Sequence, residues 1–120
     1  MSQYIDGFVL PVSKKNLAAY RRMAEKANKL WREYGALDYK ECVGDDLNVK
    51  IGLPFPKGIK SKPGETIVFA YIVYKSRAHR DRVCARVMKD PRIAAMCDPK
   101  NTPFDVDRML YGGFKTIVGF

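Results

Sequence analysis

Residues 66–75, TIVFAYIVYK, are followed without a break by Ser76 and by residues 77–89, RAHRDRVCARVMK. The first segment is continuous in β-branched and aromatic residues, which predicts an inner strand of a sheet. Ser76 is a residue type that commonly caps a helix, so the second segment is expected to be helical. Three residues at four-residue steps would form the inward face of that helix: His79, Val83 and Val87.

The first half of the chain repeats this order of elements. Residues 4–12 hold an apolar stretch that ends near Pro11 and predict a first strand. Apolar residues then recur at three- and four-residue steps, which predicts a helix that Ser13 would cap and Gly35 would end. Residues 36–43 alternate with the period of a second strand.

The remaining segments complete the pattern. Residues 44–65 are rich in Pro, Gly and Lys and predict a long loop with no more than a short turn of helix or a brief strand. A last strand is expected over residues 111–119. Strand, helix, strand, repeated once, is the doubled βαβ unit. We therefore expect residues 1–120 to form one ferredoxin-like α+β domain, with a four-stranded antiparallel sheet and both helices on one face.

The opposite face of such a sheet would be apolar and uncovered. In residues 66–75, Phe69 and Tyr71 alternate with the apolar residues Val68, Ala70 and Ile72, so both faces of the strand carry hydrophobic side chains. Monomeric proteins rarely expose a large apolar patch. A second copy of the chain would cover it, which predicts a homodimer of the dimeric α+β barrel type.

The composition sets further bounds. The chain carries 22 Lys and Arg against 13 Asp and Glu, a net charge of +9, but the basic residues are spread along the sequence. This favours a solvated surface over a clustered nucleic-acid footprint. Three cysteines without a CxxC pair predict reduced, mostly buried thiols and no metal site. We expect no cofactor, no membrane segment and a cytoplasmic location.

Several exact segments resemble a known family. They are YIDGFVLPV at 4–12, YIVYKSRAHRD at 71–81, DPKN at 98–101, FD at 104–105 and YGGF at 111–114. Together they resemble the YbaA-like proteins, a bacterial family of unknown function, over nearly the whole chain. The resemblance implies the dimeric α+β barrel fold and a bacterial cytosolic setting. It implies no established reaction and no catalytic residues.

Two residues are candidates for acid–base chemistry. His79 has an ordinary pKa near neutrality, which suits a general acid or base, but we favour the alternative of a hydrogen-bonded buried histidine. Asp6 lies among apolar residues of the first predicted strand. Asp6 and Glu41 could be paired acid–base carboxylates, but we favour ion pairs with a nearby arginine such as Arg77 or Arg108.

A pocket in this fold would lie between sheet and helices or between the two sheets of a dimer. Hydroxyl, aromatic, acidic and guanidinium side chains that could line it are the candidate ligand-binding residues: Tyr4, Trp31, Glu41, Tyr71, Tyr74, Arg77, Arg80 and Arg108. The helical pattern of residues 77–89 places Arg80 nearer water, although the segment around Ser76 could also form an anion site at a helix N-terminus.

Three functions stay open at this point. The first is a homodimer that binds a small molecule, with fold analogy extending this to a cofactor-independent, monooxygenase-like enzyme. The second is a module that binds RNA or another anion through the first helix and the Lys57–Lys62 region. The third is a protein whose surface serves only assembly.

Overall fold

A computed structural model describes residues 2–96, 98, 100 and 102–119. The chain begins with β1 (Tyr4–Ser13), a 3-10 helix (Lys14–Asn16), α1 (Leu17–Glu33) and β2 (Asp38–Val43). It continues with α2 (Phe55–Gly58), β3 (Glu65–Tyr74), α3 (Arg77–Lys89), α4 (Pro91–Met96), a second 3-10 helix (Val106–Arg108) and β4 (Leu110–Lys115).

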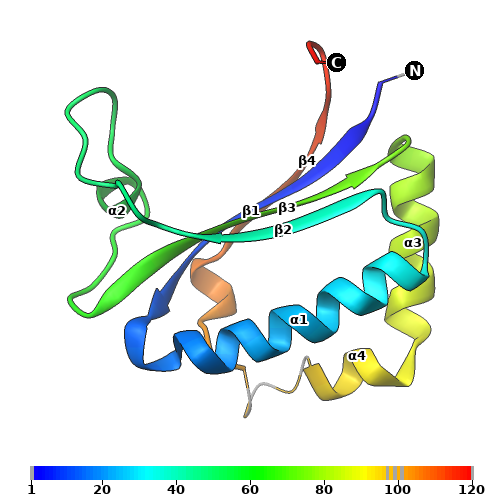
Figure 1. Cartoon of the computed structure of the whole chain (residues 1–120), viewed down its shortest axis with the longest axis horizontal. Coiled ribbons are helices and arrows are strands. Elements are labelled where there is room, and N and C mark those ends of the chain that lie inside the picture. The colour runs from blue at the N-terminus through cyan, green and yellow to red at the C-terminus, as the bar shows by residue number, and fades with distance from the viewer. Residues whose placement is uncertain (1, 97, 99, 101, 120) are drawn as a thin grey trace.

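The four strands form one antiparallel sheet in the order β2-β3-β1-β4. Figure 1 shows α1, α3 and α4 together on one face of this sheet, while only α2 and its loop lie on the opposite side, at one end of the sheet. In the register, Asp6 stands opposite Ile72, and Glu41 stands opposite Ala70. The predicted ferredoxin-like arrangement is confirmed.

Local sequence explains most of the element boundaries. The Ser76 hydroxyl accepts a hydrogen bond from the His79 backbone N–H at 3.1 Å, so α3 begins as predicted. Gly35 has a φ of +106°, in the left-handed region that glycine tolerates, and ends α1. The prediction that Ser13 caps the first helix is wrong. A 3-10 turn over Lys14–Asn16 comes first, and the Ser13 side chain makes no cap hydrogen bond.

The predicted end of the last strand is corrected, and the predicted character of the long loop is confirmed. The last strand ends at Lys115 and not at residue 119, because Lys115 stands opposite Tyr4, the first residue of β1, and residues 116–119 have no partner strand beyond it in the described chain. The loop before β3 contains the short helix α2, in agreement with the expected turn of helix. Within the described residues, no helix is both long enough and apolar enough to cross a membrane.

The hydrophobic core fills the space between the sheet and the helices. One buried cluster joins the end of α1 to α3 and α4 and contains Leu30, Ile72, Tyr74, Val83, Val87 and Ile93. A second joins the start of α1 to β1 and β3 and contains Leu10, Val12, Tyr20, Ala24 and Val68. A cleft remains beside the second cluster, where α1 faces β2, and Tyr20, Ala24 and Val68 of that cluster line it.

The face of the sheet opposite α1, α3 and α4 carries apolar side chains in contact with solvent. Phe69 in β3 is 46% exposed, and Phe114 in β4 is 61% exposed. Ile67 lies on the same face but is buried, because the loop after β2 packs over it with Leu47 and Phe55 around the same hollow. We call the exposed part, formed by Ile5, Val9, Phe69, Tyr71, Leu110 and Phe114, the open sheet face.

The predicted burial of the cysteines is only partly right. Cys84 in α3 is half-buried, but Cys42 in β2 is exposed. Cys42 alternates with Glu41 along an edge strand and therefore lies on the side of the sheet opposite α1. Cys97 lies outside the described residues.

Candidate functional site

A cleft of about 480 Å³ opens between α1 and β2. Apolar side chains form much of its wall, and a few polar groups converge in it. We call it the α1–β2 cleft; its lining residues are Leu17, Tyr20, Arg21, Ala24, Glu25 and Asn28 from α1, Tyr39, Lys40, Glu41, Cys42 and Val43 from β2, and Val68 from β3. An apolar cleft of this size with few polar groups is the usual form of a small-molecule site.

Glu41 is the polar centre of the α1–β2 cleft. One of its carboxylate oxygens accepts a hydrogen bond from the Tyr20 hydroxyl at 2.7 Å, and the other accepts one from the Tyr39 hydroxyl at 2.7 Å. Tyr39 and Glu41 share a face of β2 because they are two residues apart, and Tyr20 reaches them from the buried side of α1. The three side chains form a preorganised polar group in the wall of the cleft.

Burial dominates the electrostatics of this group. It raises the pKa of Glu41, while the hydrogen bonds from Tyr39 and Tyr20 act in the opposite direction without cancelling it. The pKa values of Tyr20 and Tyr39 are also raised, first by burial and then by the negative charge of Glu41. Both tyrosines therefore stay protonated at neutral pH and act as hydrogen-bond donors to the carboxylate.

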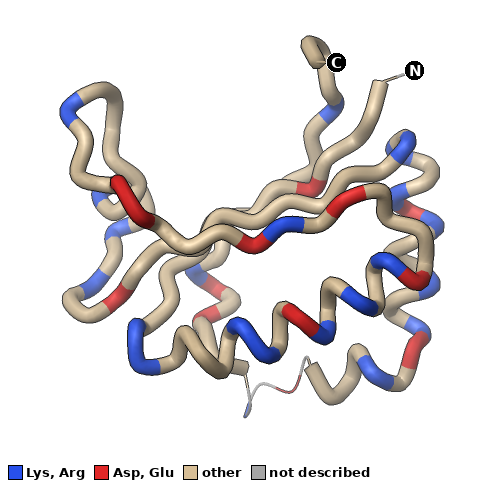
Figure 2. Tube along the Cα trace, in the orientation of Figure 1, with Lys and Arg blue, Asp and Glu red and all other residues tan. Residues whose placement is uncertain are grey.

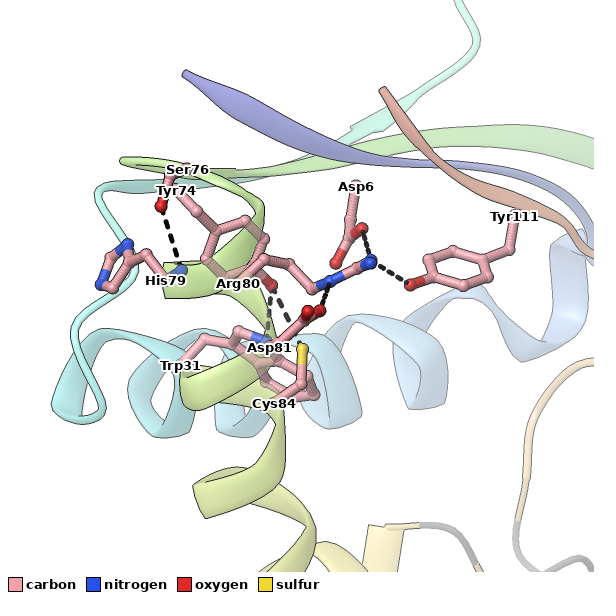
Figure 3. Close-up of polar contacts among 9 residues, drawn as sticks. All are labelled: Asp6, Trp31, Tyr74, Ser76, His79, Arg80, Asp81, Cys84 and Tyr111. Carbon is pink, nitrogen blue, oxygen red and sulfur yellow. Dashed lines mark hydrogen bonds and ion pairs between the residues drawn. The ribbon is translucent and has the colours of Figure 1, made fainter. Parts of the chain in front are cut away.

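A second polar cluster lies under β1 and β4, where α3 begins (Figure 3). Asp6 is only 2% exposed, and its carboxylate accepts a hydrogen bond from the Arg80 guanidinium at 2.6 Å. The same guanidinium contacts Asp81 at 2.7 Å and the Tyr111 hydroxyl at 3.2 Å. It also lies over the ring of Tyr4, 4.9 Å from the ring centre. The ion pair between Asp6 and Arg80 thus fixes the positions of both side chains.

Beside this cluster, a short chain of polar contacts links α1 to α3. The Trp31 indole N–H donates to the Tyr74 hydroxyl at 3.1 Å, and that hydroxyl lies 3.7 Å from the Cys84 sulfur. Burial raises the pKa of both Tyr74 and Cys84. A neutral buried thiol is a poor nucleophile, so these contacts fit a packing role.

The two catalytic candidates do not meet. His79 is half-buried, and Figure 3 shows its ring directed away from Asp6 and Tyr111. Its Nδ1 accepts a hydrogen bond from the Lys75 backbone N–H at 2.9 Å. Burial, and then the charges of Lys75 and Arg82, lower the pKa of His79. The ring therefore closes the β3–α3 turn.

The ion pairs expected from the sequence are different in the structure. Asp6 pairs with Arg80 and not with Arg77 or Arg108, and Arg80 lies inward with a side chain only 15% exposed. The inward face of α3 is as predicted at Val83 and Val87, which are both buried. Arg80, three residues before Val83, lies beside that stripe and also points inward beneath β1, where it meets Asp6. Arg77 is exposed at the first helical position.

The last two binding candidates lie apart from both polar clusters. Arg108 makes two hydrogen bonds to Glu65, at 2.7 and 2.9 Å, and so joins the end of the long loop to the segment before β4. Tyr71 lies on the open sheet face. Glu41 has hydroxyl partners only, and no Lys or Arg of the described chain lies within ion-pair distance of it.

Sequence reasoning missed two residues that the structure places at these sites. Tyr20 belongs to the apolar stripe of α1 and reads as a core aromatic residue, but a buried tyrosine hydroxyl needs a hydrogen-bond partner. That requirement points to an acid on the facing strand, and Glu41 is that acid. Tyr111 stacks on Phe8 with ring centres 4.8 Å apart, and only the sheet register brings its hydroxyl to Arg80.

The arrangement of the described residues can also be compared with two other kinds of site, a metal site and a nucleic-acid interface. Within residues 2–96, 98, 100 and 102–119, no three His, Cys, Asp or Glu side chains are grouped as metal ligands would be. Figure 2 shows Lys and Arg distributed over the helices, loops and strands with acidic residues between them. The pair Gly112–Gly113 lies inside β4, where a Cβ on Gly113 would overlap the end of the Tyr4 side chain, so a glycine there lets Tyr4 keep its position.

Comparison with other proteins links the chain to a group whose activity is not known. A family model described as "Protein of unknown function (DUF1428)" matches residues 3–106. The chain is 39% identical over 116 residues to the uncharacterized protein YbaA of Escherichia coli strain K12, and the match covers 97% of each protein. The uncharacterized protein YbaA of Shigella flexneri matches with the same identity and coverage.

Two crystal structures share the fold. One is of a dimeric ferredoxin-like protein from an uncultured marine organism, with a TM-score of 0.63, 12% identity and full coverage of both chains. The other is of a NIPSNAP family protein with unknown function from Agrobacterium tumefaciens strain C58, with a TM-score of 0.58 and 16% identity. That match covers 95% of this chain and 87% of the other. At these identities the likeness establishes the fold alone.

Proposed function

Because the chain belongs to the DUF1428 family, the YbaA-like proteins of unknown function, its activity must be inferred from its own geometry, and we propose that it binds a small molecule in the α1–β2 cleft. The observation that carries the proposal is the Glu41 carboxylate, held by two tyrosine hydroxyls in the wall of an apolar cleft of about 480 Å³. Burying a carboxylate is costly unless it is well solvated by the protein or by a ligand. A core built only for stability has no need of it.

The other polar groups support a ligand site less well. Asp6 is almost completely buried and engaged by Arg80, and the Arg80 guanidinium is itself shared among Asp6, Asp81 and Tyr111. A closed cluster of this kind has few hydrogen-bonding positions left for a ligand. The α1–β2 cleft is open to solvent and has its polar group in the wall, so ligand binding is assigned there.

The proposed test of the α1–β2 cleft is native mass spectrometry after incubation with bacterial cell extract. The wild-type protein should retain a small-molecule mass. Asn28→Trp, which places an indole in the cleft from the buried side of α1, should lose it. Lys26→Trp adds the same group to an exposed position of α1 outside the cleft and serves as the matched control. Equal retention by both variants would place the ligand elsewhere.

We also propose that the protein is a homodimer in which two open sheet faces pack against each other. The support is the row of exposed apolar side chains on that face, including Phe69, Leu110 and Phe114. A twofold axis brings the same surface of both copies into contact, and aligned packing of two sheets is a common way to bury such faces. The dimeric ferredoxin-like protein of similar fold is a further argument for this assembly.

Light scattering tests the dimer directly. At micromolar concentration the wild-type protein should give about twice the 13.7 kDa chain mass. Phe69→Lys should give the monomer mass. Leu37→Lys is the control, because Leu37 is also 46% exposed but does not belong to the open sheet face. A wild-type monomer, or equal effects of the two substitutions, would overturn this part of the proposal.

Two further hypotheses from the sequence stay predictions. A cofactor-independent oxygenase would consume dioxygen when its ligand is bound, which oxygen uptake on the identified ligand would measure. RNA binding through the basic surface would weaken steeply with salt, because phosphate contacts release counterions. Binding in the α1–β2 cleft should respond much less, since its contacts are partly buried.

A further inference from the structure

The polar group of the α1–β2 cleft presents only hydrogen-bond acceptors to a ligand. A tyrosine hydroxyl has one proton to donate, and Tyr20 and Tyr39 both donate theirs to Glu41. Their hydroxyl oxygens keep lone pairs. Each Glu41 oxygen accepts one of these bonds and keeps a further acceptor position. A ligand that approaches the three side chains therefore needs N–H or O–H donors. An anionic head group would be repelled by the lone pairs of these oxygens.

The charges around the cleft favour a cation over a neutral donor. In the described chain, Glu41 has no cationic partner. The cations nearest the cleft are at its rim: Arg21 is 82% exposed and pairs with Glu25, and Lys40 is 55% exposed and pairs with Asp38. A partly buried carboxylate without a countercharge gains most from a ligand that brings one.

The rest of the wall indicates the non-polar part of the ligand. Leu17, Ala24, Val43 and Val68 line the cleft and offer no hydrogen-bonding side chains. The rings of Tyr20 and Tyr39 add two aromatic surfaces, which attract organic cations. The volume of about 480 Å³ suits a molecule with one ring or a short chain attached to its charged group.

We propose that the ligand of the α1–β2 cleft is an organic amine, whose ammonium group contacts Glu41 and the hydroxyl oxygens of Tyr20 and Tyr39 while its apolar part lies along Leu17, Ala24, Val43 and Val68. This inference rests on the proposed function, because it names the chemical class that the same cleft takes.

The test uses three probes that share one ring and differ in the polar group: benzylamine, benzyl alcohol and benzoate. Each is titrated into the ¹⁵N-labelled full-length protein at millimolar concentrations, and the amide shifts of cleft residues are followed. Benzylamine should bind most tightly and benzoate least. Glu41→Gln should weaken benzylamine binding about 10- to 100-fold, the range for one charged hydrogen bond, and should leave benzyl alcohol nearly unchanged.

Glu25→Gln provides the matched control, since it removes an acid from the exposed rim of the same cleft and should change benzylamine binding by no more than about threefold. Thermal melts of each variant check folding, and the order of the three probes on the wild-type protein does not depend on any variant. Equal binding of amine and alcohol in the cleft, or tighter binding of benzoate, would overturn the amine inference and leave the proposed function intact. No shift in the cleft with any probe would overturn both.

Discussion

Removing the positive charge beside Asp6 should strongly destabilise the fold. Arg80→Met keeps much of the packing of the Arg80 side chain but leaves the Asp6 carboxylate, 2% exposed, without its cation. Breaking a buried pair from one side costs about 3–5 kcal/mol. For a domain whose total stability is about 5–15 kcal/mol, this is a large fraction.

Urea unfolding followed by the fluorescence of Trp31, the single tryptophan, is a suitable assay. With an m-value of about 2 kcal/mol per molar urea, a loss of about 4 kcal/mol lowers the midpoint by about 2 M. All samples should have the same protein concentration, because dimerisation would make the midpoint depend on it. Asp6→Asn should cost less, about 1–2 kcal/mol, because Arg80 keeps its contacts with Asp81 and Tyr111.

The double variant Asp6→Leu with Arg80→Met separates the charge effect from packing. It removes both charges, so it should be more stable than Arg80→Met alone by about 2 kcal/mol. Two results would refute the reasoning: a loss below about 1 kcal/mol for Arg80→Met, or purely additive effects in the double variant. Either would mean that water reaches Asp6 in solution.

Three smaller perturbations test other parts of the structure. Ser76→Ala removes the cap of α3 and should cost about 1 kcal/mol in thermal or urea unfolding. Hydrogen bonds from the Arg108 side chain, and then from the Lys62 backbone N–H, lower the pKa of Glu65 from its usual value of 4.5 to about 2. The contribution of the Glu65–Arg108 pair to folding stability, on the order of 1–2 kcal/mol for a pair near the surface, is therefore present above pH 4.5 and lost as the pH falls toward 2. Glu65→Gln should flatten this part of the curve of stability against pH. Gly113→Ala should cost about 1–3 kcal/mol of stability because its Cβ would displace Tyr4. Gly112→Ala is the control and should cost less than about 1 kcal/mol, because its Cβ would make an ordinary contact. Comparable losses for the two variants would contradict the packing argument.

Periodicity and capping residues were enough to predict the order of the elements and the layers of the fold. The continuous apolar segment before Ser76 became the inner strand β3, and the helix after it has the predicted bounds. The family resemblance was confirmed by the comparisons. These features depend on local sequence and on the few ways in which two βαβ units can share a sheet.

The contacts of the candidate site could not be predicted in the same way. Glu41 was recognised as a candidate residue, but its partners depend on how α1 lies over β2. A helical pattern does not determine that position to better than about one residue. Arg80 was placed nearer water because the helical pattern identifies the buried stripe with Val83 and Val87, but does not show that a charged residue beside it pairs with Asp6 of β1. Tyr20 was missed because a tyrosine in an apolar stripe cannot be told from other core aromatics without its hydroxyl partner.

The central claim, that the α1–β2 cleft is the ligand site, is tested most directly by a crystal structure of the protein grown with the molecule it retains from cell extract. The account predicts ordered ligand density in the α1–β2 cleft, with a hydrogen-bond donor of the ligand within about 3 Å of a Glu41 carboxylate oxygen. Ligand density on the open sheet face, or beside Asp6 and Arg80 with the α1–β2 cleft empty, would contradict it.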